Sequence, residues 1–181
     1  MSSPSERKRP NILVTGTPGV GKTSTASLIA EKLDMHHTNI GNIIKEKKCH
    51  LEYDAALDTH VLDEEKLLDT LEIDFDTDHV SGGIVADHHA CELFPERWFD
   101  LILVLRADTE VLYDRLTERG YSEKKRNENM QCEIMRVVVD EAKESYEPEI
   151  VIELTNNSID QMDQNVARVE AWTLQWIQDR E

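Results

Sequence analysis

The stretch GTPGVGKT at residues 16–23 constrains the fold of this chain more than any other feature. It matches the pattern G-x-x-x-x-G-K-[ST], in which glycines let backbone N–H groups wrap around a phosphate and the next helix adds its positive N-terminus. That pattern belongs between a strand and a helix. The apolar run NILVT precedes it, and apolar residues at helical spacing follow it. The sequence therefore predicts a strand, a phosphate loop and a helix, with a nucleoside triphosphate as ligand.

The side chains of this loop can be assigned to parts of the triphosphate. We expect Lys22 to bridge the β- and γ-phosphates and the Thr23 hydroxyl to ligate Mg²⁺. Ser24 is placed to contact the α-phosphate. Gly19 and Gly21 allow the backbone to follow the anion. ATP and Mg²⁺ are therefore the expected cofactors.

The remainder of the chain alternates short apolar runs with helical patterns. IVAD at residues 84–87, LILVLR at 101–106 and EIVIEL at 149–154 are typical of buried parallel strands, and a short strand is expected before the helix in HHTNIGNIIKEKK. With the strand before the phosphate loop, these make five. They predict one α/β domain over residues 1–181, with a parallel sheet covered by helices on both faces.

The expected helices differ in how clearly their ends are marked. One lies in the acidic stretch 52–78, and another runs from the N-caps Asp108 and Thr109 to about Arg119. A single long helix is predicted over residues 127–146, after a turn-like basic stretch. The last helix should bury a stripe that consists of Ile159, Met162, Val166, Val169 and Trp176.

Charge and cysteine content restrict the class of protein. The chain carries 37 acidic and 20 basic residues, a formal net charge of −17, which opposes general binding to nucleic acid or anionic membranes and favours a basic partner. Its three cysteines form no C-x-x-C pair, and no apolar run is long enough to span a membrane. We expect a soluble protein of a reducing compartment, whose residues 1–9 form a flexible basic tail. A nuclear localisation signal in ERKR is the alternative for that tail.

The segment ADHHACE at residues 86–92 supplies the second part of the predicted site. Asp87 directly follows an apolar strand and suits the acidic group that orients magnesium beside a phosphate loop. In extended backbone, Asp87 and His89 would project together while His88 points to the other side. We then expect His89 to donate a hydrogen bond to phosphate, or to position a water molecule or the acceptor. A transition-metal site of Asp87, His89 and Cys91 is less favoured, because magnesium prefers hard oxygen ligands.

A basic stretch interrupts the acidic chain at Arg119, Lys124, Lys125 and Arg126. Cations there can neutralise charge on a transferring phosphoryl group. Gly120 makes the start of the stretch mobile, as a lid must be. The alternative interpretation is a solvated turn.

Three stretches together resemble the adenylate kinase isoenzyme 6 family, which includes the coilin-interacting nuclear ATPase and its yeast ribosome-assembly counterpart. They are GTPGVGKT, ADHHACELFPERWFDLILVLR and RLTERGYSEKKRNENMQCEI. The resemblance, from about Pro10 to Trp176, implies a three-layer P-loop NTPase fold of the adenylate kinase type. It also implies an NMP-binding segment at about residues 39–62 and a short lid at about 118–128.

The resemblance also implies roles for particular residues. Gly19, Gly21, Lys22, Thr23 and Ser24 would contact ATP, together with Arg119 of the R-G-Y motif and Ser158 in the loop near the adenine. Asp87 and His89, from the D-x-H motif, would be the magnesium-orienting carboxylate and the catalytic histidine, beside the catalytic Lys22. The acceptor would meet Asn39, Gly41 and Lys45. Relatives commonly carry arginine at position 45, and lysine cannot grip phosphate bidentately.

Two functions remain open under this resemblance. The first is a nucleoside monophosphate kinase that transfers phosphate from ATP to AMP or another NMP. The second is an ATP-driven assembly switch in the nucleus and cytoplasm, which binds a small-subunit ribosomal protein in a pre-ribosomal particle. Ordinary adenylate kinases carry D-G-F-P-R where this chain has DHHACE. Loss of that arginine favours weak kinase chemistry and the switch.

Overall fold

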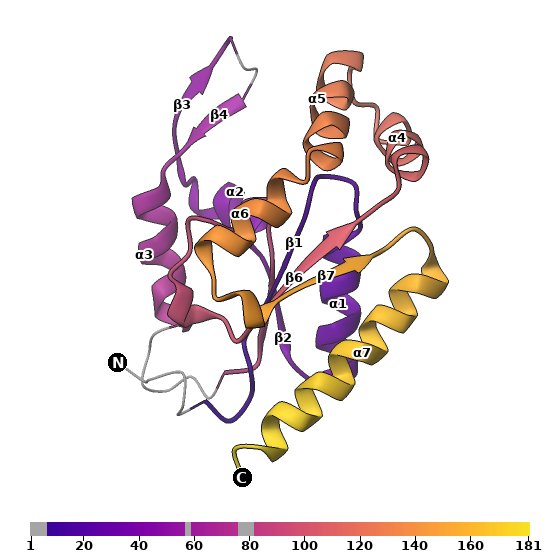
Figure 1. Cartoon of the computed structure of the whole chain (residues 1–181). Helices are drawn as coiled ribbons and strands as arrows, with labels where there is room; N and C mark the ends of the chain where they lie inside the picture. Colours follow the sequence, from indigo (N-terminus) through magenta and orange to yellow (C-terminus); the bar gives the residue numbers. More distant parts are fainter. Residues whose placement is uncertain (1–6, 57–58, 76–81) are drawn as a thin grey trace.

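The structure is a computed structural model that describes residues 7–56, 59–75 and 82–181. A central sheet of five parallel strands runs in the order β2-β5-β1-β6-β7 (Figure 1). The strands are β1 (Ile12–Thr15), β2 (His36–Asn39), β5 (Ile84–Asp87), β6 (Leu101–Arg106) and β7 (Val151–Thr155). The predicted five-stranded α/β fold is confirmed.

Helices cover both faces of this sheet, which makes three layers. Helices α2, α3 and α6 contribute to the core on one face, and α1, α4, α5 and α7 contribute to the core on the other. The helices are α1 (Lys22–Leu33), α2 (Ile40–Lys47), α3 (Glu64–Phe75), α4 (Thr109–Glu118), α5 (Glu123–Ile134), α6 (Val137–Ser145) and α7 (Ile159–Gln178). Two short 3₁₀ helices are η2 (Glu96–Trp98) and η3 (Pro148–Ile150).

Alternation along the strands divides the core in two. In β6, Ile102 and Val104 join the cluster on the α3 side, whereas Leu101, Leu103 and Leu105 join the cluster on the α1 side. Successive side chains of a strand point to opposite faces, so a strand that is covered on both faces must be apolar at every position. This is the physical reason for the uninterrupted run LILVLR.

The predicted long helix at residues 127–146 is wrong. Helix α5 ends at Ile134, and α6 begins at Val137 after Arg136 adopts a left-handed φ of 59°. The Arg136 guanidinium donates to both carboxylate oxygens of Glu153 at 2.8 Å, which holds the break. The basic stretch before it is not a turn either, because α5 already starts at Glu123 with Ser122 as its N-cap. The latter part of the predicted lid is therefore helical.

Residues 39–62 contain a hairpin that the sequence did not predict. Strands β3 (His50–Asp54) and β4 (Thr59–Leu62) pair antiparallel and project away from the sheet (Figure 1). Leu51 and Tyr53 are exposed on it. The two strands of the hairpin lack a buried face, so the alternation of apolar and polar residues that indicates a strand is weak in their sequence.

Two further expectations are corrected. Residues 7–9 are not a free tail, because the buried Arg7 bonds to Asp100 at 3.0 Å and Arg9 donates to the Asp34 carbonyl at 2.6 Å. Residues 1–6 lie outside the described part. Ile159, predicted to be buried, is 73% exposed at the start of α7.

In the part of the chain that the structure describes, no helix is both long and apolar enough to cross a membrane. The longest, α7, has 20 residues and alternates polar with apolar side chains.

Candidate functional site

The phosphate loop joins β1 to α1, as predicted. Gly16, Gly19 and Gly21 have φ values of 146°, 96° and 92°, in the region that favours glycine. A Cβ on Gly16 would lie 2.7 Å from the Leu105 carbonyl oxygen, so a side chain cannot fit there. Helix α1 begins at Lys22, and its unpaired first N–H groups therefore face the space that the loop encloses. This geometry suits a bound phosphate chain.

Lys22 folds back over the loop, with its Nζ donating to the Gly16 and Thr17 carbonyls at 2.9 and 3.0 Å. Burial lowers the pKa of Lys22 to about 8, while nearby Asp87 acts in the opposite direction. The ammonium group is therefore mostly protonated at neutral pH. A partly buried cation beside N–H groups of the loop is a strong site for an anion.

Asp87 ends β5, the strand beside β1, and lies against the loop. Thr23 Oγ1 donates to Asp87 Oδ2 at 2.9 Å, and Asn39 Nδ2 lies 2.9 Å from each Asp87 oxygen. The carboxylate is 3% exposed. A hydroxyl and a carboxylate are the hard oxygen ligands that Mg²⁺ prefers, so this pair fits the ion. Asn39, which was predicted to contact the acceptor, lies beside Thr23 and Asp87.

The two histidines after Asp87 do not diverge as predicted. Strand β5 ends at Asp87, so the alternation of side chains stops there. The rings of His88 and His89 lie 4.4 Å apart, and both line one cavity. Burial lowers the pKa of His88 to about 3 and also lowers that of His89, with Lys22 adding to both shifts. Both rings are therefore neutral near pH 7.

That cavity has a volume of about 680 Å³ and is formed by α2, the β3–β4 hairpin and the residues after β5. Gly41, Lys45 and His89, which were predicted for the acceptor and the chemistry, lie together in its wall. Lys45 is the only lysine or arginine among the described residues that line it. His50 and His60 of the hairpin, whose rings are 4.7 Å apart, complete its outer side.

A second cavity, of about 340 Å³, opens at the phosphate loop. Ser24, Arg119 and Ser158 line it together, as the resemblance implied, beside Gly19 and Gly21.

Arg115 also belongs to this second cavity and was not predicted. Its guanidinium donates to the Gly19 carbonyl at 3.2 Å and to the Asn156 carbonyl at 3.0 Å. Asn156 in turn donates to the Val20 carbonyl at 2.8 Å. Arg115 lies four residues before Arg119 on a helical pattern, and this spacing could have indicated their shared face.

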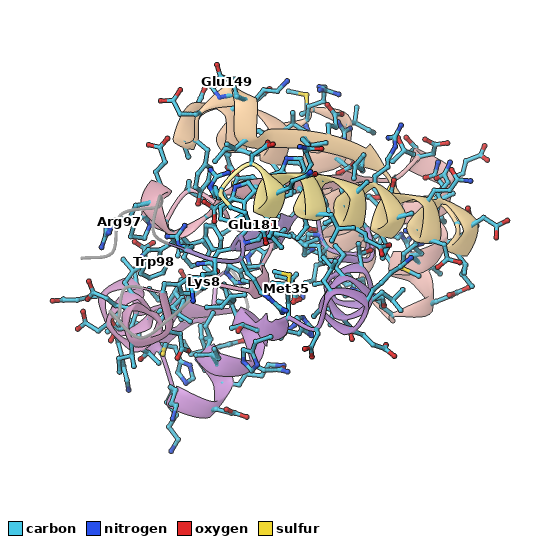
Figure 2. All side chains as sticks on the ribbon, turned by 90° about the horizontal axis from the view of Figure 1, so that it is seen from below. Lys8, Met35, Arg97, Trp98, Glu149 and Glu181 are labelled. Carbon is cyan, nitrogen blue, oxygen red and sulfur yellow. The ribbon has the colours of Figure 1, made fainter. Side chains whose placement is uncertain are left out.

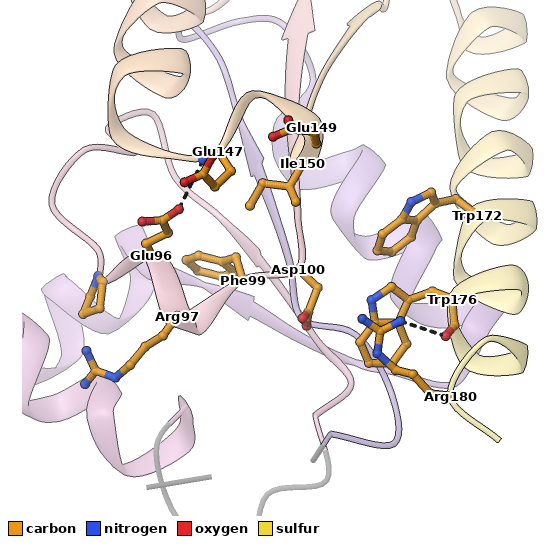
Figure 3. A pocket seen from close by; sticks show the side chains of 11 residues that line it. Glu96, Arg97, Phe99, Asp100, Glu147, Glu149, Ile150, Trp172, Trp176 and Arg180 are labelled. Atoms are coloured by element: carbon orange, nitrogen blue, oxygen red, sulfur yellow. Dashed lines mark hydrogen bonds between the residues drawn. The ribbon is translucent and has the colours of Figure 1, made fainter. Parts of the chain in front are cut away.

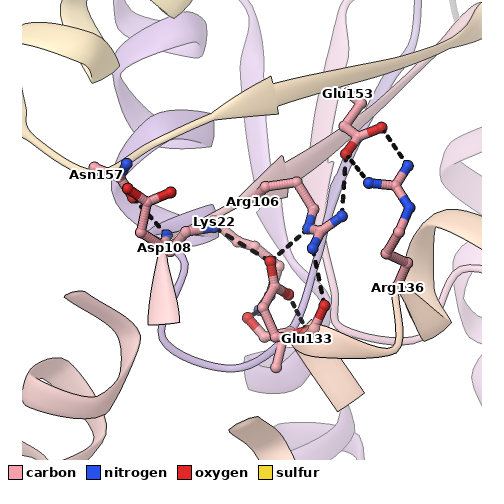
Figure 4. A network of polar contacts seen from close by, with 9 residues as sticks. Lys22, Arg106, Asp108, Glu133, Arg136, Glu153 and Asn157 are labelled. Atoms are coloured by element: carbon pink, nitrogen blue, oxygen red, sulfur yellow. Dashed lines mark hydrogen bonds and ion pairs between the residues drawn. The ribbon is translucent and has the colours of Figure 1, made fainter. Parts of the chain in front are cut away.

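Glu133, on α5, ties the phosphate loop to the end of β6 (Figure 4). Its buried carboxylate accepts from Thr17 Oγ1 at 2.6 Å and from the Ala107 N–H at 3.2 Å, and it pairs with Arg106. Glu133 lies near the end of the stretch RLTERGYSEKKRNENMQCEI, but the resemblance assigned no role to it. The structure thus connects the phosphate loop to the helix that forms the latter part of the predicted lid and continues beyond it.

Replacement of Glu133 by glutamine is expected to raise the KM for ATP about fivefold to tenfold, because a charged acceptor is lost from a buried network. Steady-state ADP formation measures this. Glu128→Gln, an exposed change on the same helix, is the matched control. Equal KM values for the two variants would contradict the role of Glu133.

Among the described residues, Cys91 belongs to a group of potential metal ligands that does not include Asp87 or His89. The ligand atoms of this group, which lie within 4.8 Å of one another, belong to Cys91, Glu92 and Glu141. Burial raises the pKa of the Cys91 thiol to about 12, which keeps it protonated at neutral pH. Cys91 is packed in the core. The alternative ligand set of Asp87, His89 and Cys91 is not assembled in this part of the chain.

Stability in acid should depend on His88. Its pKa is about 3 in the folded protein and 6.5 in an unfolded chain, so below pH 6.5 the unfolded chain binds the proton more strongly. Stability is therefore present above pH 6.5 and lost as the pH falls, by about 2 kcal/mol down to pH 5. His88→Phe should remove this loss in urea unfolding at pH 7 and pH 5. His36→Phe, at an exposed position, should retain it, and the same acid loss in both variants would refute the assignment.

Comparison with known proteins finds relatives over nearly the whole chain. A family model described as an AAA domain matches residues 12–136. The adenylate kinase isoenzyme 6 homolog of Dictyostelium discoideum is 45% identical over 96% of this chain and 97% of its own length. The homolog of Caenorhabditis elegans is 48% identical over 93% and 92%. The crystal structure of shikimate kinase from Bacteroides thetaiotaomicron has a TM-score of 0.61 at 16% identity, covering 90% of this chain and 97% of that one. The last likeness concerns the fold alone.

Proposed function

Because this chain belongs to the adenylate kinase isoenzyme 6 family and is a P-loop nucleotide kinase, we propose that it transfers the γ-phosphate of ATP to AMP or another nucleoside monophosphate. One observation carries this proposal. Ser24 lines the cavity at the phosphate loop and His88 lines the cavity after Asp87, and the residues just before them, Thr23 and Asp87, are hydrogen-bonded to each other at 2.9 Å. A donor and an acceptor can therefore be held on the two sides of one reaction centre.

The donor cavity has the chemistry for ATP. Lys22 and the N-terminus of α1 would hold the β- and γ-phosphates, and Ser24 would contact the α-phosphate. Arg119 and Ser158 would contact the rest of the nucleotide from α4 and the loop before α7. Thr23 and Asp87 would hold Mg²⁺, which supplies charge neutralisation to the phosphates when bound.

The acceptor cavity has a lysine at position 45, where relatives commonly carry arginine. Lys45 would face the acceptor phosphate from the cavity wall that it shares with Gly41. Asn39, which is bonded to Asp87, would meet the acceptor from the side of the phosphate loop. A lysine binds phosphate as a point charge rather than as a bidentate fork, so the acceptor should bind weakly. Weak binding of the acceptor should make the transfer of phosphate to AMP slow.

Transfer needs positioning more than proton removal. An acceptor phosphate oxygen already carries negative charge and can attack the γ-phosphate in line without a general base. Closure of residues 118–128 would exclude water, and Arg119 would neutralise charge as it develops.

Hydrolysis of ATP is the second reaction that we propose. When no acceptor is bound, a water molecule can occupy the cavity beside His89. The lowered pKa keeps that imidazole neutral at pH 7, so it has one ring nitrogen free to accept a proton from water. His89 would thus orient water for attack.

A role in small ribosomal subunit maturation is proposed on family membership and charge. The net charge of −17 favours a basic protein partner, such as a ribosomal protein in a pre-ribosomal particle, over direct general binding to RNA. A nuclear and cytoplasmic location would follow from that role. In this second function, ATP turnover switches the grip on the partner.

The two functions are separated by measuring ADP formation with ATP alone, with ATP and AMP, and with ATP and a basic small-subunit ribosomal protein. A kinase responds to AMP, with ADP formed from both nucleotides. A switch responds to the protein. A strong AMP response with indifference to the protein rejects the switch, and no response to AMP rejects the kinase.

A further inference from the structure

A groove of about 740 Å³ lies at the opposite end of the sheet from the phosphate loop. Its walls come from the segments just before β6 and β7 and from the C-terminal half of α7. Figure 2 views the molecule from this end, with Arg97 and Glu149 labelled. Since Lys22 and Asp87 lie at the other ends of the strands, the groove is separate from both cavities of the nucleotide site.

One wall of the groove is aromatic. Trp172 and Trp176 of α7 lie across from Phe99 (Figure 3). The guanidinium carbon of Arg180 lies 3.8 Å from the ring centroid of Trp176, and its Nη1 donates to the Trp176 carbonyl at 3.3 Å. This pair shows that a guanidinium fits on an aromatic face of the groove. Within the described ranges, no cation of the chain lies over the ring of Trp172.

The other wall carries carboxylates. Glu96, Glu147 and Glu149 are exposed there, and the Glu147 N–H donates to Glu96 Oε1 at 3.2 Å. Among the residues that the structure places, neither Glu147 nor Glu149 forms an ion pair. Asp100 at the base is already neutralised by Arg7 at 3.0 Å. The exposed negative charge of the groove thus comes from its glutamates.

The arginines that line the groove are engaged elsewhere. Arg97 lies 3.6 Å from Glu72 on α3, and Arg180 covers Trp176. They leave an aromatic ring on one wall of the groove and three carboxylates on the other, which together form the surface that a cationic segment recognises.

We propose that this groove binds an arginine- or lysine-bearing peptide segment of a protein partner. One cationic side chain stacks on Trp172, and neighbouring cations face Glu96, Glu147 and Glu149. The proposal gives a location to the basic partner of the proposed function and rests on that part of it. It does not depend on the phosphate chemistry.

The test uses the full chain and a fluorescein-labelled peptide of alternating arginine and glycine, followed by fluorescence anisotropy. Reversal of two charges in the groove, Glu147→Lys with Glu149→Lys, should weaken peptide binding about tenfold. The matched control reverses two exposed charges on α3, Glu65→Lys with Asp69→Lys, and should weaken it far less. If the two double variants lose the same amount of peptide affinity, only the net negative charge of the whole protein attracts the peptide. That result would contradict binding in the groove.

The aromatic wall is tested separately. Trp172→Phe keeps a ring and should keep binding, whereas Trp172→Leu should weaken it about threefold or more. Two of the three tryptophans line the groove, so peptide should also change the intrinsic fluorescence of the wild-type protein. Equal peptide affinity of the phenylalanine and leucine variants would contradict stacking on Trp172. If a peptide of alternating glutamate and glycine binds as tightly as the arginine-glycine peptide, the groove does not recognise cationic side chains.

Two further readouts separate the remaining outcomes. If charge reversal in the groove changes the sedimentation of the free protein but not peptide affinity, a second copy of the chain is the occupant and the proposal fails. ATP hydrolysis without peptide should be the same in the groove variants and wild type. If the wild-type protein does not hydrolyse ATP at all, the proposed enzymatic function is wrong, whereas the result on peptide binding still stands.

Discussion

Lys22→Ala is expected to lower ADP formation at least about 100-fold, both with ATP alone and with ATP and AMP. Lys22 is the partly buried cation of the phosphate loop, and its Nζ lies within hydrogen-bond distance of two loop carbonyls. Alanine removes the group that neutralises charge on the transferring phosphate. The loss should appear in turnover and in ATP affinity, measured by steady-state kinetics and by equilibrium titration with ATP.

The control for Lys22 is another lysine on the same helix. Lys32 lies near the end of α1, is half-exposed and pairs with Glu170 at 2.9 Å, far from the loop. Lys32→Ala changes the net charge by the same amount and should leave turnover within about twofold of wild type. If the two alanine variants lose turnover equally, the catalytic assignment of Lys22 fails.

His89→Gly is expected to slow ATP hydrolysis about 100-fold while the Kd for ATP changes little. The ring of His89 lines the acceptor cavity and not the cavity at the loop, so it lies where water or acceptor would bind. Transfer to AMP should suffer less, because a phosphate oxygen needs no base. Single-turnover hydrolysis and ATP titration, run on the same samples, measure the two effects.

A histidine outside the site controls for composition and backbone. His36 is exposed at the start of β2, and His36→Gly should leave hydrolysis near the wild-type rate. A loss of ATP affinity in the His89 variant as large as its loss of turnover would instead mean that His89 holds nucleotide, which would remove its catalytic role.

Local patterns were sufficient for most of the fold. The glycines of residues 16–21 and the runs IVAD and LILVLR predicted the strands and the loop, because strain at positive φ and burial on both faces act on neighbouring residues. The hairpin in residues 39–62 was missed because its side chains are largely exposed, which leaves no apolar alternation. The break at Arg136 was missed because its stabilising partner, Glu153, lies on another element.

The site was predictable where a motif named its residues. Lys22, Thr23 and Asp87 lie together as predicted, since parallel strands bring their carboxyl ends to one edge of the sheet. The direction of His88 was not predictable, because the alternation argument holds only as far as the strand continues. Strand β5 ends at Asp87, and the next two rings turn into the same cavity.

Residues close together in the chain were enough to predict the phosphate loop, the parallel sheet around it and the family to which the chain belongs. The contact between Glu133 and Thr17, a residue 116 positions away, arises from three-dimensional packing. The packing also brings the tryptophans of α7 to face, across a groove, Glu96 of η2 and the glutamates before β7. Such contacts depend on the order of the strands and the ends of the helices, and no local spacing records them.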